Sequence, residues 1–138
     1  AGNLDKDINI NTKDEIGELT PLAKSWSRPP MLVINSGAAD SKFDSTQRCY
    51  VVSNNDQKKI DKLEFTIQAT EDSPVVNPAF VIKNWGDHQV KLRVNGKKIK
   101  QGKNFRIGHV RTINQYDLVI WLELESDSKM EFSIEHKK

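Results

Sequence analysis

The chain has 138 residues, a length at which one domain with a single hydrophobic core is expected. Its 21 Lys and Arg residues nearly balance its 19 Asp and Glu residues, and a net charge of +2 gives no reason to expect a nucleic acid as partner. The single cysteine, Cys49, excludes an intramolecular disulfide and a metal site made of several cysteines, and no apolar run approaches the length of a membrane span.

Residues 1–30 are polar and are expected to form a linker and lead-in, ahead of a β-sandwich domain over residues 31–138. Two helix starts are predicted there, because Thr12 opens a capping-box pattern and Thr20 precedes a proline at the first helical position. The second helix is expected to lay two apolar side chains against the sheet, those of Leu22 and Trp26. The chain opens without an initiator Met, so we expect it to be a processed or excised part of a longer protein.

Short apolar runs separated by turn residues follow Met31, which is typical of an all-β protein. The sequence therefore predicts an antiparallel β-sandwich, Ig-like or jelly-roll-like, with a short helical or irregular N-terminal lead-in. Eight strands are predicted, over residues 31–35, 47–53, 60–70, 78–85, 88–95, 104–112, 116–125 and 129–135. Asn95 and Gly96 form the strongest hairpin signal, because a type I′ turn needs positive φ at both positions.

Two of these strands lack the alternation of apolar and polar residues. Residues 79–82 and 118–122 are apolar throughout, which predicts central strands covered on both faces. On this interpretation Trp121 belongs to the core.

Positive charge is concentrated in one segment, since residues 87–111 carry a single acid, Asp87. The cations are Lys91, Arg93, Lys97, Lys98, Lys100, Lys103, Arg106 and Arg111. Two interpretations remain open. The cations pair across the sheet with acids of the following strands, such as Glu123 and Glu125, or they form a basic groove for an anionic ligand.

No catalytic motif is present. The histidines His88, His109 and His136 follow no metal-ligand spacing, and Cys49 is expected to be a small buried hydrophobe rather than a nucleophile. The glycines form no phosphate-binding loop, so no cofactor is expected. A loop-bound Ca²⁺ is an alternative to plain turns for five residues: Asp40, Asp44, Asn54, Asn55 and Asp56.

Aromatic residues at strand ends are candidates for stacking on sugar rings, with packing over the end of the sandwich as the alternative. Trp85 ends one predicted strand and Tyr116 begins another. Basic side chains of the neighbouring strands would then bind acidic groups of the sugar. The candidate ligand-binding residues are Trp85, Tyr116, Lys91, Arg93, Arg106, His109 and Arg111.

Five segments together resemble the C-terminal β-sandwich modules of exported proteins from polysaccharide-degrading bacteria. They are KSWSRPPML (24–32), QRCYVV (47–52), SPVVNPAFVIKNWG (73–86), NFRIGH (104–109) and VIWLELES (119–126). The resemblance covers about residues 22–135, its motifs are structural, and it transfers no site residues.

The resemblance implies a non-catalytic accessory domain of a larger polysaccharide-processing protein, located in the periplasm, at the cell surface or outside the cell. The expected partners of such a domain are the neighbouring domain, which it supports, and a polysaccharide, which it binds weakly. No nucleic acid is expected as a partner. The alternative is a dedicated carbohydrate-binding protein for an acidic polysaccharide. A small enzyme with an unrecognised site ranks last.

Overall fold

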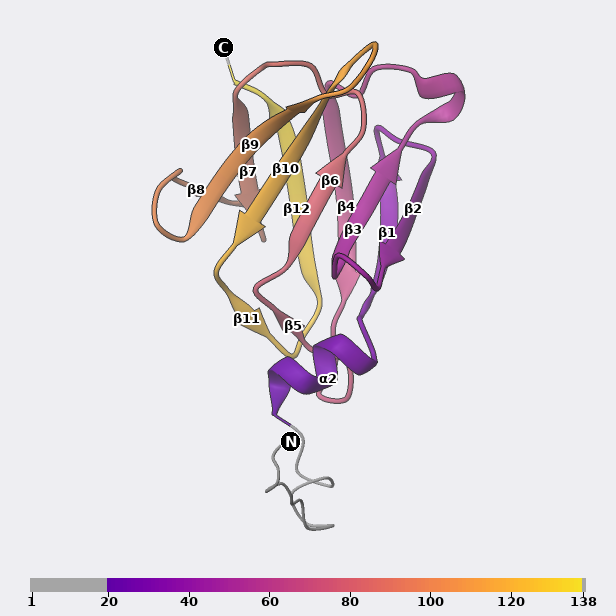
Figure 1. Ribbon diagram of the computed structural model, residues 1–138. Helices are drawn as coiled ribbons and strands as arrows, with labels where there is room; N and C mark the ends of the chain where they lie inside the picture. Colours follow the sequence, from indigo (N-terminus) through magenta and orange to yellow (C-terminus); the bar gives the residue numbers. More distant parts are fainter. Residues whose placement is uncertain (1–19, 138) are drawn as a thin grey trace, which may run out of the picture.

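Residues 20–137 are described by a computed structural model, in which two five-stranded β-sheets pack face to face (Figure 1). The prediction of an all-β sandwich is confirmed. Sheet A contains, in spatial order, β1 (Met31–Ser36), β4 (Lys62–Gln68), β12 (Met130–His136), β7 (Val90–Val94) and β8 (Lys97–Ile99). Sheet B contains β2 (Asp40–Asp44), β3 (Cys49–Ser53), β6 (Ala79–Ile82), β10 (Tyr116–Leu122) and β9 (Phe105–Arg111).

Three short elements complete the fold. Strands β5 (Val75–Val76) and β11 (Glu125–Ser126) pair with each other, and a 3₁₀ turn, η1, covers Asn55–Gln57. The helix α2 (Pro21–Ser27) lies across the lower end of the sandwich beside β5 (Figure 1). Within residues 20–137, no helix has both the length and the hydropathy to cross a membrane.

Strand pairing is antiparallel throughout the described sheets except between β3 and β6, which run parallel. The hairpin predicted at Asn95 and Gly96 is confirmed: φ is 52° and 80° at the two residues, and they join β7 to β8. Sequence patterning missed β2, because its residues Asp40–Asp44 are polar apart from Phe43.

The core forms where the inward faces of the two sheets meet. Phe65 of β4 and Phe132 of β12 stack with their ring centroids 5.0 Å apart. Phe80 of β6 reaches both rings from the opposite sheet, at 5.3 and 5.5 Å. All three side chains are buried, so this aromatic cluster joins the two layers.

The prediction that residues 79–82 and 118–122 are covered on both faces is wrong. In β6 and β10 the inward side chains are buried, whereas Val81 and Val119 are half-buried and Trp121 is 45 % exposed. No third layer covers sheet B within the described residues. The outward valines fit because β-branched side chains pack laterally on a pleated surface.

The helix predicted at Thr20 is confirmed. The Thr20 hydroxyl accepts a hydrogen bond from the Ala23 N–H at 3.2 Å, and proline occupies the first helical position. Leu22 and Trp26 line a groove between α2 and the sandwich and are only partly buried, at 39 % and 46 % exposure. The helix start predicted at Thr12 lies outside the described residues.

Candidate ligand-binding site

Trp85 is not available as an exposed stacking platform, because its side chain is completely buried. Its indole Nε1–H donates to the His88 carbonyl at 3.2 Å, and its ring meets the His136 ring edge-on at 4.5 Å. The end of a predicted strand is therefore covered by the loop that follows it. Trp85 therefore packs at the end of the sandwich, which was the alternative to sugar stacking.

The chain's three histidines meet around Trp85, although they lie far apart in the sequence. The His88 and His136 rings stack with centroids 4.0 Å apart, and His109 Nε2 lies 2.8 Å from the His88 carbonyl oxygen. Burial and the neighbouring His88 lower the pKa of His136. No group of three or more His, Cys, Asp or Glu side chains within residues 20–137 is arranged to hold a metal ion.

The buried polar groups have structural partners. Asp117 is 3 % exposed, and its carboxylate accepts hydrogen bonds from the Asn84 N–H at 2.9 Å, Gln115 Nε2 at 2.9 Å and Lys83 Nζ at 3.2 Å. Cys49 is buried, as predicted, and burial raises the pKa of its thiol. A thiol held in its neutral form is a poor nucleophile.

Two of the five residues considered for Ca²⁺, Asp44 and Asn54, accept hydrogen bonds from the backbone of their own turns. Asp44 Oδ1 accepts hydrogen bonds from the N–H groups of Thr46 and Gln47, at 2.9 and 3.1 Å. Asn54 Oδ1 accepts from the Asn55 N–H at 2.9 Å. The Asp44–Thr46 contact is an Asx turn, the alternative to a metal site.

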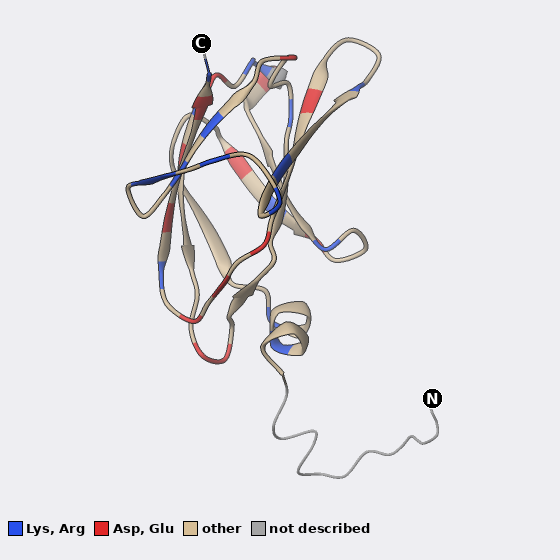
Figure 2. Cartoon of the chain, turned by 90° about the vertical axis from the view of Figure 1, so that its left-hand side faces the viewer, with Lys and Arg blue, Asp and Glu red and all other residues tan. Residues whose placement is uncertain are grey.

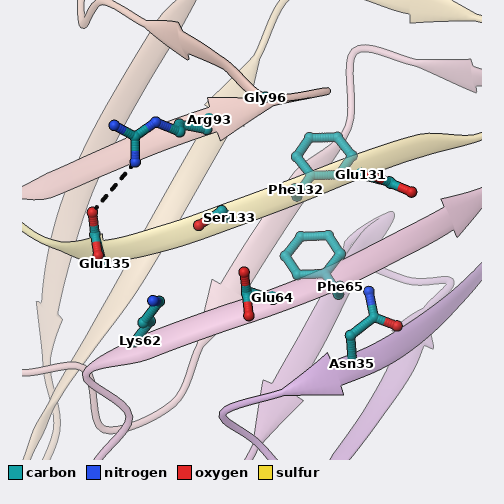
Figure 3. Close-up of a pocket in the computed structure, with 10 residues that line it drawn as sticks. All are labelled: Asn35, Lys62, Glu64, Phe65, Arg93, Gly96, Glu131, Phe132, Ser133 and Glu135. Carbon is teal, nitrogen blue, oxygen red and sulfur yellow. Dashed lines mark ion pairs between the residues drawn. The ribbon is translucent and has the colours of Figure 1, made fainter.

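The outer face of sheet A is polar and carries part of the basic segment (Figure 3). Lys91 Nζ and Arg93 Nη1 each lie 3.7 Å from Glu135 Oε1 on the adjacent strand β12. The expected cross-strand pairing therefore occurs, but with Glu135 instead of Glu123 and Glu125. Sequence reasoning missed this partner because the spatial order of the strands was not known.

The other six cations of residues 87–111 form no ion pair with an acid among the described residues. They occupy the edge strands β8 and β9 and the loop between them, on the side of the sandwich that faces the viewer in Figure 2. All six are exposed, and we call them the basic edge: Lys97, Lys98, Lys100, Lys103, Arg106 and Arg111. Charge on an edge strand also prevents pairing with other chains, which is a structural explanation for part of the set.

Trp121 lies beside this basic edge, on the outer face of sheet B. Its backbone is directly opposite Arg106 on β9 and Ala79 on β6. A Cβ placed on Gly108 would lie 3.4 Å from the indole Cη2 and Cζ3 atoms, so the outer edge of the Trp121 ring reaches Gly108. The site was missed because an apolar run gives no sign of which face is solvent-exposed.

A second exposed tryptophan lines an apolar groove of about 360 Å³ between α2 and the sandwich. Trp26 is 46 % exposed, but the guanidinium carbon of Arg48 lies 3.7 Å from the ring centroid. This cation–π contact already occupies one face of the indole. The groove adjoins the Trp121 face through Ala79.

The seven predicted site residues do not form one site. Tyr116 and Arg111 lie opposite each other in the β9–β10 pair, and both are exposed. Tyr116 is separated from Trp121 by five positions along β10, roughly 17 Å in an extended strand, and its side chain has the opposite facing. Trp85 is buried, His109 packs at the end with His88, and Lys91 and Arg93 belong to sheet A. Arg106 alone lies beside the exposed Trp121.

Comparison with known proteins identified no matching family model, no similar curated protein and no similar solved structure.

Proposed function

We propose that this chain is a non-catalytic accessory domain of a larger, exported polysaccharide-processing protein, and that it holds an acidic polysaccharide along its basic edge. The observation that carries the proposal is the set of six exposed cations without acidic partners. Lys91 and Arg93, by contrast, have Glu135 beside them. The resemblance to accessory modules of polysaccharide-degrading bacteria supports the same role.

The form of the surface supports binding to an extended polymer. The basic edge includes the outer strands of both sheets and the loop that connects them, so its charges are distributed along one side of the molecule (Figure 2). Exposed charges attract a polyanion through solvent, and this attraction weakens as salt shortens the screening length from about 8 Å at physiological ionic strength to about 3 Å at 1 M. The binding is therefore expected to be weak and sensitive to salt.

Affinity electrophoresis tests the binding. Migration through a gel containing a uronic acid polymer should be retarded, and the retardation should disappear in 1 M salt. Replacing Lys100 and Lys103 with Gln should remove most of it. The matched control replaces Lys91 and Arg93 with Gln, which lowers the net charge by the same amount but removes cations that share the carboxylate of Glu135.

Two results would contradict the polysaccharide proposal. One is a lack of retardation by the uronic acid polymer at low salt. The other is equal loss of retardation in the Lys100/Lys103 and Lys91/Arg93 variants, because net charge alone would then explain the migration.

The accessory role has its own test. The complete coding sequence should contain a catalytic-sized domain in addition to this one, whereas a dedicated carbohydrate-binding protein needs no such domain. A complete gene without a second domain would favour the dedicated binding protein. Hydrolase or lyase activity in the isolated domain would contradict both.

A further inference from the structure

We propose that Trp121 is the stacking platform for one pyranose ring of the acidic polysaccharide and that Arg106 binds the carboxylate of the stacked or adjoining sugar. This inference rests on the proposed function, because it names the residues that recognise the polymer. It moves the aromatic contact from the strand end predicted by sequence to the open face of sheet B.

The first support is the position of the indole ring. Gly108 has no side chain, and the outer edge of the six-membered ring, Cη2 and Cζ3, comes within van der Waals distance of where a Cβ would be. The ring edge therefore contacts β9, while the residue remains 45 % exposed. Ala79, its neighbour on β6, is small, so on that side no large side chain lies directly beside the ring.

The second support is the chemistry of sugar recognition. The apolar C–H face of a pyranose is attracted to the negative face of an aromatic quadrupole, which gives geometry as well as buried area. An indole held at its edge by β9 and 45 % exposed suits this contact. No cation covers Trp121 within the described residues, whereas Arg48 already lies over Trp26.

The third support is the charge beside the ring. Arg106 is exposed and directly opposite Trp121, and side chains at such positions have Cβ atoms roughly 5 Å apart. A guanidinium presents paired donors that match the two oxygens of a carboxylate. Lys103 and Lys100 precede Arg106 in the chain and extend the positive charge along the basic edge.

One acid lies close to this arrangement. Glu123 is exposed, follows Trp121 by two residues, and its backbone N–H donates to the Asn104 carbonyl at 2.9 Å, which continues the β9–β10 pairing. A carboxylate there repels an anionic sugar and accepts hydrogen bonds from its hydroxyls. Replacing Glu123 with Gln should therefore strengthen binding of a uronate more than binding of its neutral form.

A purely structural role for Trp121 is the competing explanation, because an aromatic ring in contact with a glycine of an edge strand stabilises the sheet. Variants separate the two roles. Trp121→Leu keeps an apolar side chain beside Gly108 but removes the aromatic face. Trp121→Phe keeps the apolar side chain and the aromatic face. Thermal unfolding of each variant shows whether the fold is retained before binding is measured.

The experiment is titration of the protein with a short oligouronate and, separately, with its carboxyl-reduced counterpart. Trp121→Leu should weaken the affinity for the oligouronate about 3- to 10-fold, and Trp121→Phe should restore most of it. Arg106→Gln should weaken binding of the oligouronate and leave binding of the carboxyl-reduced form unchanged. Trp26→Leu, the matched control, should leave both affinities unchanged.

A change in tryptophan fluorescence on ligand addition is a second readout, which a purely structural role of Trp121 would not produce. The chain has three tryptophans, and Trp121 is the exposed one whose ring no cation covers. The oligouronate should change the emission of the wild-type protein and of the Trp26→Phe variant, and should leave the emission of Trp121→Phe unchanged.

The outcomes distinguish this inference from the proposed function. If the Lys100/Lys103 variant loses binding while Trp121→Leu binds as wild type, the basic edge binds the polymer and the stacking inference is wrong. If neither change affects binding, both proposals are wrong. Loss of affinity in Trp26→Leu but not in Trp121→Leu would move the contact to the groove beside α2 and overturn the inference.

Discussion

Asp117 shows how a single residue ties separate segments of this domain together. Its carboxylate is buried on the outward side of β10 by Lys83 and Asn84, which follow β6, and by Gln115. A backbone N–H and a side-chain amide solvate the charge in place of water. Lys83 contributes less, because its side chain is 45 % exposed.

Replacing Asp117 with Ala should therefore lower the free energy of unfolding by about 2–3 kcal/mol, since hydrogen bonds to a charged group are lost and the Asn84 N–H loses this acceptor. Lys83→Met should cost less than about 1 kcal/mol, because it removes only a half-exposed ion pair. Urea unfolding of both variants measures the difference. Equal costs would mean that the ion pair, and not the backbone hydrogen bond, provides the stability.

At the scale of elements, one loop glycine fixes how the chain leaves its first strand. Gly37 follows β1, where the register with β4 shifts between Ile34 and Ser36, and it adopts φ +97°. A Cβ at Gly37 would lie 1.9 Å from the Lys62 carbonyl oxygen. Gly96 also has positive φ, +80°, but a Cβ there would meet no atom within 4 Å.

These two glycines make a matched pair for mutation. Gly96→Ala should cost about 1–2 kcal/mol, the strain of a left-handed conformation with a side chain. Gly37→Ala has the same strain and must also displace the backbone of β4, which should add about 1–3 kcal/mol. Thermal or urea unfolding measures both, and similar costs would show that the loop at Gly37 moves without resistance.

The buried face of a strand can be predicted from the sequence only where apolar and polar residues alternate. Leu63, Phe65 and Ile67 of β4 alternate with polar residues, so their inward facing was predictable. In β10, Val119 and Trp121 occupy outward positions that read as core, because periodicity cannot identify the buried face of a strand that is apolar on both. The same ambiguity concealed the candidate platform.

At the scale of the whole molecule, the two outer faces differ. Sheet A exposes charged pairs such as Arg93 with Glu135 (Figure 3), whereas sheet B exposes Trp121 together with the half-buried Val81 and Val119. Only the tertiary structure reveals this difference between the two faces. The histidine cluster, at the end of the sandwich opposite α2, is likewise visible only in the tertiary structure. His88, His109 and His136 come from a loop, from sheet B and from sheet A. Their meeting depends on strand order, which local sequence does not encode.

The histidine cluster should make stability depend on pH. Burial and His88 lower the pKa of His136 below its ordinary value of 6.5, with Lys59 adding to the effect and Asp61 and the Trp85 carbonyl opposing it. The unfolded chain therefore binds a proton at a higher pH than the folded chain does. Stability should be full above pH 6.5 and decline as the pH falls below it toward the folded pKa.

Thermal unfolding between pH 7.5 and 5 measures this decline. His136→Gln should flatten the dependence in that window, because the group whose pKa differs between the two states has been removed. Ser128→Ala, at an exposed turn, is a control that should keep the wild-type slope. An unchanged slope in His136→Gln would assign the pH dependence to other groups.

The last strand, β12, is also the middle strand of sheet A, between β4 and β7. On the ribosome, residues 62–68 and 90–94 leave the exit tunnel well before residues 130–136, yet neither segment can complete its pairing until the later one appears. Two strand edges remain unpaired during that interval, and Phe65 lacks the ring of Phe132 that stacks on it in the complete fold. Translation therefore produces a nascent chain that cannot close its own core, and the window for chaperone binding or mispairing ends only when the final strand is released.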